Sequence, residues 1–132
     1  MGPNPPEFEM LRLNMVGDVA VARVTPHELR FPKQAEALSY ELGLVIGQDW
    51  AAKTLVDLGR VGYVGSTTHA VLVGLVKKAG ELGRVVKFCG LSPQVRIGAD
   101  IIGLDRIADI RGTEAEALAA FAESTPGPAF SS

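Results

Sequence analysis

Three consecutive hydroxyl side chains, Ser66, Thr67 and Thr68, and the following histidine, His69, have the types and spacing that could do chemistry. A serine three residues before a histidine is compatible with a nucleophile and its base. However, the GxSxG turn of many hydrolases is absent, and no later histidine is left to complete a triad in the usual order. The sequence therefore predicts that His69 is a polar residue near a helix start and that no residue is catalytic.

The glycines before these hydroxyls do not form a nucleotide-binding loop. The stretch "GRVGYVGSTT" contains no GxxxxGK[ST], and Gly62 and Gly65 do not complete a GxGxxG. The two histidines and the one cysteine, His27, His69 and Cys89, are not closely paired, which predicts no metal site and no cofactor. Because these catalytic patterns fail, we expect that the chain is not an enzyme.

The hydroxyl cluster lies where a strand is followed by a helix. The stretch "VGYVGSTTHAVLVGLVKKAG" ends in a helical repeat of apolar residues: Val71, Leu72, Leu75, Val76, Ala79 and then Leu82. A helix N-terminus has unpaired N–H groups and a partial positive charge, which stabilise a phosphate placed there. Two interpretations stay open: Ser66 caps the helix, or the cluster is a phosphorylation switch with Ser66 as acceptor and Thr67 as the next candidate.

The elements that must position this cluster alternate along the chain. We expect strands at 8–16, 19–24, 52–58, 84–90 and 106–110, with the first two forming a hairpin, and helices at 32–46, 66–82, 93–102 and 113–122. Helices that regularly link strands imply an α/β fold with a mixed, mostly parallel sheet of about five strands and an N-terminal hairpin.

Length and composition predict a single domain over residues 7–123, between proline-rich tails at 1–6 and 124–132 that we expect to be disordered. The chain has 132 residues and a net charge of −2, which does not favour a nucleic-acid or anionic-membrane partner. Its longest apolar run is shorter than the ~20 residues needed to cross a bilayer. One cysteine cannot form an internal disulfide, so we expect a cytoplasmic protein without direct membrane insertion.

The stretch from "TLVDLGRVGYVGSTTHAVLVG" to "GLDRIADI" resembles the STAS domain, the family named for sulfate transporters and anti-sigma factor antagonists. Family members show a strand ending in Asp, then Asp-Ser-Ser-Gly-Leu-Gly at the start of an apolar helix, and later a "GLDRI"-like segment. The similarity extends from about Met10 to Ile110. It implies a STAS-like fold with the helices packed mainly on one face of the sheet.

The resemblance also assigns the residues of the cluster. Asp57 corresponds to the strand-end aspartate, and Ser66 to the serine that the antagonists' kinase phosphorylates. Gly65 stands where the family has aspartate, Thr67 matches the second hydroxyl, Thr68 replaces a glycine, and His69 replaces an exposed leucine. The implied phosphorylation sites are Ser66 and Thr67. The implied partner-binding residues are Asp57, Gly65, Ser66, Thr67, Thr68 and His69.

The function implied by the resemblance is a protein-interaction module of signalling and transcription regulation, an anti-sigma factor antagonist that works by partner switching. Its partner would be an anti-sigma factor resembling a serine kinase, which binds the unmodified form and releases the phosphorylated one. Whether the protein also forms a homodimer stays an open question of the sequence. Two alternatives also remain: a non-phosphorylated STAS scaffold in a signalling or transporter complex, and a small-ligand or nucleotide-binding domain.

Overall fold

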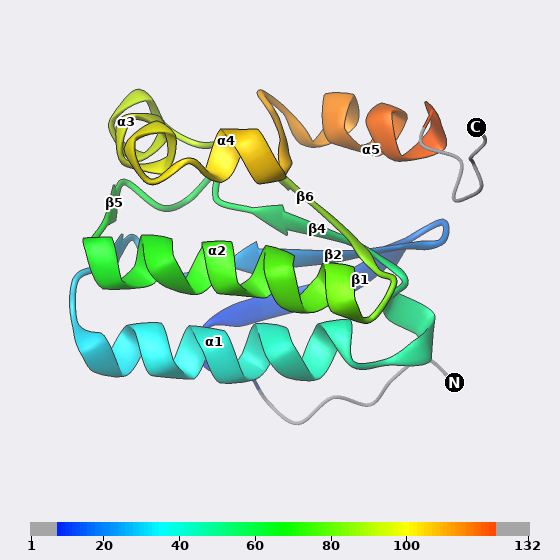
Figure 1. Cartoon of the computed structure of the whole chain (residues 1–132), viewed down its shortest axis with the longest axis horizontal. Coiled ribbons are helices and arrows are strands. Elements are labelled where there is room, and N and C mark those ends of the chain that lie inside the picture. Colours follow the sequence, from blue (N-terminus) through cyan, green and yellow to red (C-terminus); the bar gives the residue numbers. More distant parts are fainter. Residues whose placement is uncertain (1–7, 124–132) are drawn as a thin grey trace.

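The computed structural model describes residues 8–123, which alternate between strands and helices (Figure 1). The strands are β1 (Leu11–Val16), β2 (Val19–Val24), β3 (Glu28–Leu29), β4 (Lys53–Asp57), β5 (Tyr63–Val64), β6 (Val85–Cys89) and β7 (Asp109–Arg111). The helices are α1 (Pro32–Ile46), a 3-10 turn (Asp49–Ala51), α2 (Ser66–Glu81), α3 (Pro93–Ile102), α4 (Leu104–Ile107) and α5 (Glu114–Glu123). The predicted tails at 1–6 and 124–132 lie outside the described residues, so the domain boundaries stay a prediction.

Five strands form the main sheet in the order β1-β2-β4-β6-β7. The hairpin β1–β2 is antiparallel, with Gly17 at φ 60° in its turn, and the other three pairs are parallel. This confirms the predicted mixed, mostly parallel sheet with an N-terminal hairpin. Parallel neighbours require crossover connections, which the helices between them provide.

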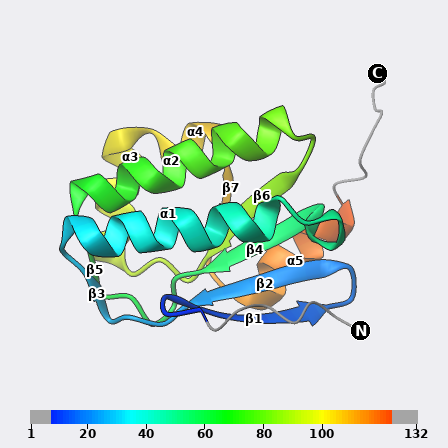
Figure 2. The same cartoon turned by 90° about the horizontal axis from the view of Figure 1, so that it is seen from below.

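Alternate residues of each central strand enter two different cores, as the two-residue period of a strand dictates. Ala22, Val56 and Phe88 lie in the larger core, which the apolar sides of α1 and α2 cover. Val21, Leu55 and Cys89 lie in a smaller core with Ala117 and Phe121 of α5. The helices are therefore mainly on one face of the sheet, as predicted, and α5 covers the other (Figures 1 and 2).

Side-chain hydrogen bonds fix the first residues before β1 and the start of α5 onto these layers. The buried Glu41 carboxylate of α1 accepts the backbone N–H groups of Glu9 and Met10, both at 2.9 Å. At the start of α5, Arg23 of β2 donates to both oxygens of Glu114, at 2.7 and 2.9 Å. These contacts hold the first strand against α1 and the start of α5 against the sheet.

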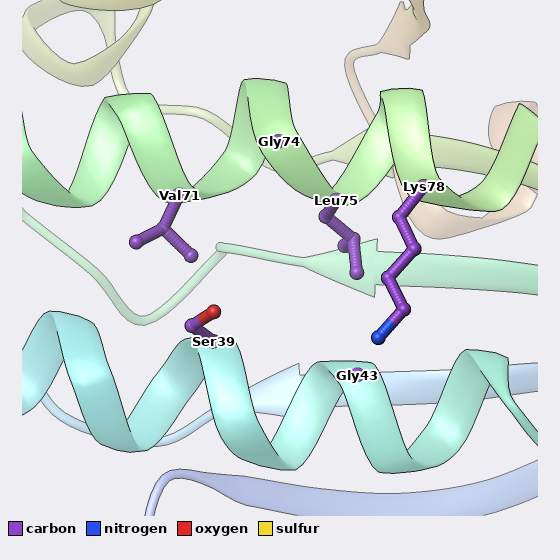
Figure 3. A pocket seen from close by; sticks show the side chains of 6 residues that line it. All are labelled: Ser39, Gly43, Val71, Gly74, Leu75 and Lys78. Carbon is purple, nitrogen blue, oxygen red and sulfur yellow. The ribbon is translucent and has the colours of Figure 1, made fainter.

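Helices α1 and α2 lie side by side and leave a hollow of about 230 Å³ between them (Figure 3). Gly43 of α1 and Gly74 of α2 contribute no side chains to its walls, and Lys78 extends from α2 across the hollow toward α1. A Cβ atom at Gly43 would lie 3.7 Å from the Lys78 Nζ. A second hollow of about 390 Å³ continues toward the helix starts and shares Ser39 and Val71 with the first.

Three expectations about local structure were wrong. The first strand, expected from Phe8, begins at Leu11, because the Glu9 and Met10 N–H groups donate to the Glu41 carboxylate rather than to a neighbouring strand. The segment 106–110 is a strand only from Asp109, because Gly103 at φ 85° ends α3 and the chain then forms one helical turn that buries Leu104. Leu82 follows α2 and is 47% exposed rather than inward-facing. The structure also contains β3 and β5, two-residue strands that are too short to produce a periodic pattern.

Candidate functional site

The predicted hydroxyl cluster forms the first turn of α2. The N-cap is Gly65, with extended backbone angles of φ −75° and ψ 165°, and Ser66 is the first helical residue. The first intrahelical bond runs from the His69 N–H to the Gly65 carbonyl at 3.0 Å, so the preceding N–H groups have no acceptor within the helix. Because glycine has no side chain, no side chain at the N-cap position caps this helix. The interpretation of Ser66 as the cap is therefore wrong.

A small parallel sheet of two strands holds this turn in place. β5 pairs with β3, and the N–H of Gly65 donates to the Leu29 carbonyl at 2.9 Å. A Cβ atom at position 65 would lie 3.4 Å from that carbonyl oxygen, which is ordinary contact. The backbone there does not require a glycine, so an aspartate at position 65 is compatible with the fold.

The four predicted residues of the turn divide by exposure. Ser66 and Thr67 are exposed, whereas Thr68 and His69 are buried, with 1% and 4% of their surfaces exposed. The expectation that His69 replaces an exposed leucine is therefore corrected: its imidazole is covered by α3. Thr68 and His69 can support a binding surface from beneath but present little of it themselves.

Ser66 borders a groove of about 470 Å³ between the start of α2 and α3. Its lining is mainly apolar and comprises Tyr63, Val64, Ser66, His69, Gln94, Gly98, Ile101 and Ile102. Thr67 instead lines the hollow of about 390 Å³ between α1 and α2. The two exposed hydroxyls therefore face different hollows, and only Ser66 shares one with His69.

The outer face of α3 extends this groove with exposed isoleucines. Ile97 is 61% exposed and Ile101 is 82% exposed, while Val95 and Ala99 on the inner side are buried. Sequence reasoning missed this outer face because it followed the inner residues. The signal was present, since Ile97 and Ile101 are four residues apart and so lie on one helical side. Large exposed apolar side chains beside a groove are typical of a protein-binding surface.

His69 has an unusual environment for an imidazole. Its Nδ1 atom is buried and has no hydrogen-bond partner among the described residues. Burial lowers the pKa of His69 below its ordinary value of 6.5, because it disfavours the charged form. The ring occupies space left by Gly98, where a Cβ atom would come within 2.4 Å of the His69 Nε2.

Asp57 belongs to a separate cluster. Its carboxylate accepts the Gly59 N–H at 2.8 Å and lies 3.7 Å from the Arg23 guanidinium, which also binds Glu114 and Asn14. Burial, followed by the charge of Asp57, raises the pKa of the neighbouring Cys89 to about 12. This cluster connects the ends of β2, β4 and β6 with α5, and Asp57 does not line the groove beside Ser66.

Several absences apply to residues 8–123. This part of the chain has no cluster of three or more His, Cys, Asp or Glu side chains that could hold a metal ion. Likewise, no helix within it is long and apolar enough to cross a membrane.

Comparison with known proteins identifies one family. The family profile "STAS domain" matches residues 28–117, which include the β3–β5 pair, the first turn of α2 and α3. No sequence among curated proteins matches the chain significantly.

Solved structures with the same fold include several anti-sigma factor antagonists. One STAS domain protein from Planctomyces limnophilus is 24% identical, with a TM-score of 0.74 over 85% of this chain and 97% of that one. An antagonist from Mycobacterium paratuberculosis is also 24% identical, with a TM-score of 0.74 over 83% and 91% of the two chains. The phosphorylated form of SpoIIAA, a Bacillus cell fate determinant, is 20% identical, with a TM-score of 0.64 over 84% and 98%.

Proposed function

Because the chain belongs to the STAS domain family, we propose that it is an anti-sigma factor antagonist that works by partner switching. The unmodified form binds an anti-sigma factor with a serine kinase fold, and phosphorylation of Ser66 releases that partner. Structures of SpoIIAA in unphosphorylated and phosphorylated forms are among the proteins of this fold, which supports a phosphorylated state here. In this role the chain is a cytoplasmic binding module rather than an enzyme.

The observation that carries the proposal is the exposed Ser66, which begins a helix without a side-chain cap and borders an apolar groove. A kinase can reach its hydroxyl, and the free N–H groups of the helix start tolerate a phosphate. Phosphorylation adds roughly −1.5 to −2 charges beside Val64, Ile101 and Ile102. A partner packed against those side chains would then have to bury that charge or detach.

The partner surface we propose centres on Ser66, the groove and the outer face of α3. Gly65 allows a partner backbone to approach the helix start closely, and Thr67 is the second acceptor candidate. Thr68 and His69 contribute by supporting the surface from beneath. Asp57 contributes indirectly, by ordering the chain between β4 and β5.

A second candidate is a STAS scaffold that is not phosphorylated. It is favoured by Gly65, which removes the acidic residue that the family has before its serine. One protein of the same fold comes from the stressosome, described as a signal integration and transduction hub, and is 19% identical with a TM-score of 0.65. Phosphorylation of Ser66 in the wild type by the partner kinase separates the two candidates, since the scaffold should be modified only when Gly65→Asp restores the acidic residue. A homodimer belongs to this scaffold role and would appear in light scattering of the purified protein.

The decisive experiment compares the affinity of the partner for the unmodified protein and for the protein carrying phosphoserine at position 66. The partner is the protein that co-purifies from the native host, and calorimetry measures the affinity. We expect a loss of at least tenfold on phosphorylation, or about 1.4 kcal/mol. Ser66→Ala should keep binding and block modification, and Thr67→Ala is the matched control that should leave modification intact. Equal affinities for the two forms would refute partner switching.

A further inference from the structure

The proposed switch leaves the buried imidazole of His69 without a role. The side chain is 4% exposed, and its Nδ1 atom has no hydrogen-bond partner in the described part of the chain. An unsatisfied buried polar atom costs stability, so a leucine at this position would fit an apolar helix–helix contact better. The presence of an imidazole here calls for a ligand or a charge that it meets in another state of the protein.

That ligand must reach the groove between α2 and α3, because His69 lines it. Ser66 lines the same groove, one helical turn before His69. Residues three apart lie on the same side of a helix, with their Cβ atoms about 5–6 Å apart. Since both residues line one groove, a phosphate on the Ser66 hydroxyl would share that groove with the imidazole.

No other charge competes for the imidazole among the described residues that line the groove. From β5, the titratable side chain that lines it is Tyr63, while α3 contributes Gln94, Gly98, Ile101 and Ile102, none of which is charged. The Arg30 guanidinium lies over the Tyr63 ring at 4.5 Å and is paired with Glu28 at 2.7 Å. The charged residues of α3, Arg96 and Asp100, pair with each other at 2.8 Å. From α4, Asp105 and Arg106 are exposed and do not line the groove.

We propose that His69 is the intramolecular binding residue for a phosphate on Ser66: in the phosphorylated protein the imidazole takes a proton from solvent and donates a ring N–H to the phosphate oxygens. This inference rests on phosphorylation of Ser66 as proposed above. The proton adds one positive charge next to the roughly −1.5 to −2 charges of the phosphate. The resulting ion pair keeps the phosphate against the groove wall, over the surface that a partner would need.

Two effects favour the neutral form of His69 in the unmodified protein. Burial lowers the pKa of the imidazole, and the partial positive charge of the helix N-terminus also opposes its protonation. An opposite charge within ~4–6 Å favours the charged form, so the phosphate would raise the pKa of His69 relative to the unmodified protein. Because the phosphorylated protein would bind this proton more tightly than the unmodified protein, the contact is favoured as the pH falls and is lost as the pH rises through the His69 pKa of the phosphorylated form.

The experiment is an NMR titration of the histidine side chains in protein with phosphoserine encoded genetically at position 66. The sequence has only two histidines, so the exposed His27 is an internal control. We expect at least a tenfold increase in the proton affinity of His69 relative to unmodified protein, with His27 unchanged. A matched control carries phosphothreonine at position 67, which faces the other hollow and should change His69 much less.

Phosphorus NMR provides the reciprocal measurement. The second pKa of the phosphate at position 66 should be lower in the wild type than in His69→Asn. An unchanged His69 titration, or equal shifts from phosphates at 66 and 67, would overturn the inference. Because the phosphate is encoded and no partner is present, this result is independent of the calorimetric test. Equal partner affinities would refute the switch while leaving the histidine–phosphate contact intact.

Discussion

The contact between His69 and Gly98 can be tested by adding one methyl group. In Gly98→Ala the new Cβ would lie 2.4 Å from the His69 Nε2 and 3.0 Å from its Cδ2. Atoms this close must move apart, and overpacking of this kind costs about 1–3 kcal/mol. Against this cost stands the preference of a helix interior for alanine over glycine, about 1 kcal/mol.

The sign of the effect should therefore depend on the imidazole. In the wild-type background we expect Gly98→Ala to be neutral or destabilising by up to about 2 kcal/mol, since the steric cost of about 1–3 outweighs a gain of about 1. In the His69→Ala background the ring is gone, and the same substitution should stabilise by about 1 kcal/mol. The difference between the two backgrounds is a coupling free energy of about 1–3 kcal/mol.

Urea denaturation of the wild type, Gly98→Ala, His69→Ala and the double variant measures this coupling. The cost of His69→Ala itself cancels in this double-mutant cycle. Gly74→Ala is the matched control, because a Cβ atom there meets nothing within 4 Å. It should stabilise α2 by roughly 0.5–1 kcal/mol whether or not His69 is present. A coupling below about 0.5 kcal/mol between positions 69 and 98 would refute the buried placement of the imidazole against α3.

Three other parts of the structure give further predictions. Leu75→Ala should lower the free energy of unfolding by roughly 2–5 kcal/mol, since this side chain is 6% exposed in the larger core; a loss under about 1 kcal/mol would mean that α2 does not pack through it. The thiol of Cys89, whose pKa burial raises to about 12, should resist alkylation at pH 8 and react at the rate of global unfolding, and rapid labelling of the native protein would contradict this. Arg111 first and then Lys87 lower the pKa of Asp109 below 3.8, so its contribution to stability is present above pH 3.8 and is lost as the pH falls through the folded value. Asp109→Asn should remove that part of the acid dependence, and an unchanged pH profile between pH 2 and 5 would count against the ion pairs.

The sheet was predictable because each element carried a strong local signal. The expected hairpin of the first two strands is present, and the helix expected from position 113 begins at a capping box, in which the Glu116 N–H donates to the Thr113 Oγ1 at 3.1 Å. The pair β3–β5 was not predictable, because two residues form no period and their pairing depends on distant parts of the chain. The turn into α4 was missed because Gly103 indicates where α3 ends but not the conformation of the next residues.

The site divides in the same way. The strand-to-helix junction that carries the hydroxyls was predictable, and Ser66 and Thr67 are exposed there, while their role stays a prediction. The burial of His69 was not predictable, because it depends on Gly98, which lies in another helix. The groove could not be inferred either, since its lining comes from β5, α2 and α3, and only packing brings these together.

The topology of the sheet also determines when the groove beside Ser66 can form during folding. Only the hairpin joins neighbouring segments of the main sheet, whereas its parallel pairs bring Val19 opposite Lys53 and Lys53 opposite Val85. Since distant pairings lose more chain entropy on closing, the hairpin should form early and the parallel sheet later. The groove beside Ser66 also needs Ile101 and Ile102. During synthesis on the ribosome, a chain that has emerged only as far as α2 therefore lacks the groove beside Ser66, which we propose as the partner surface.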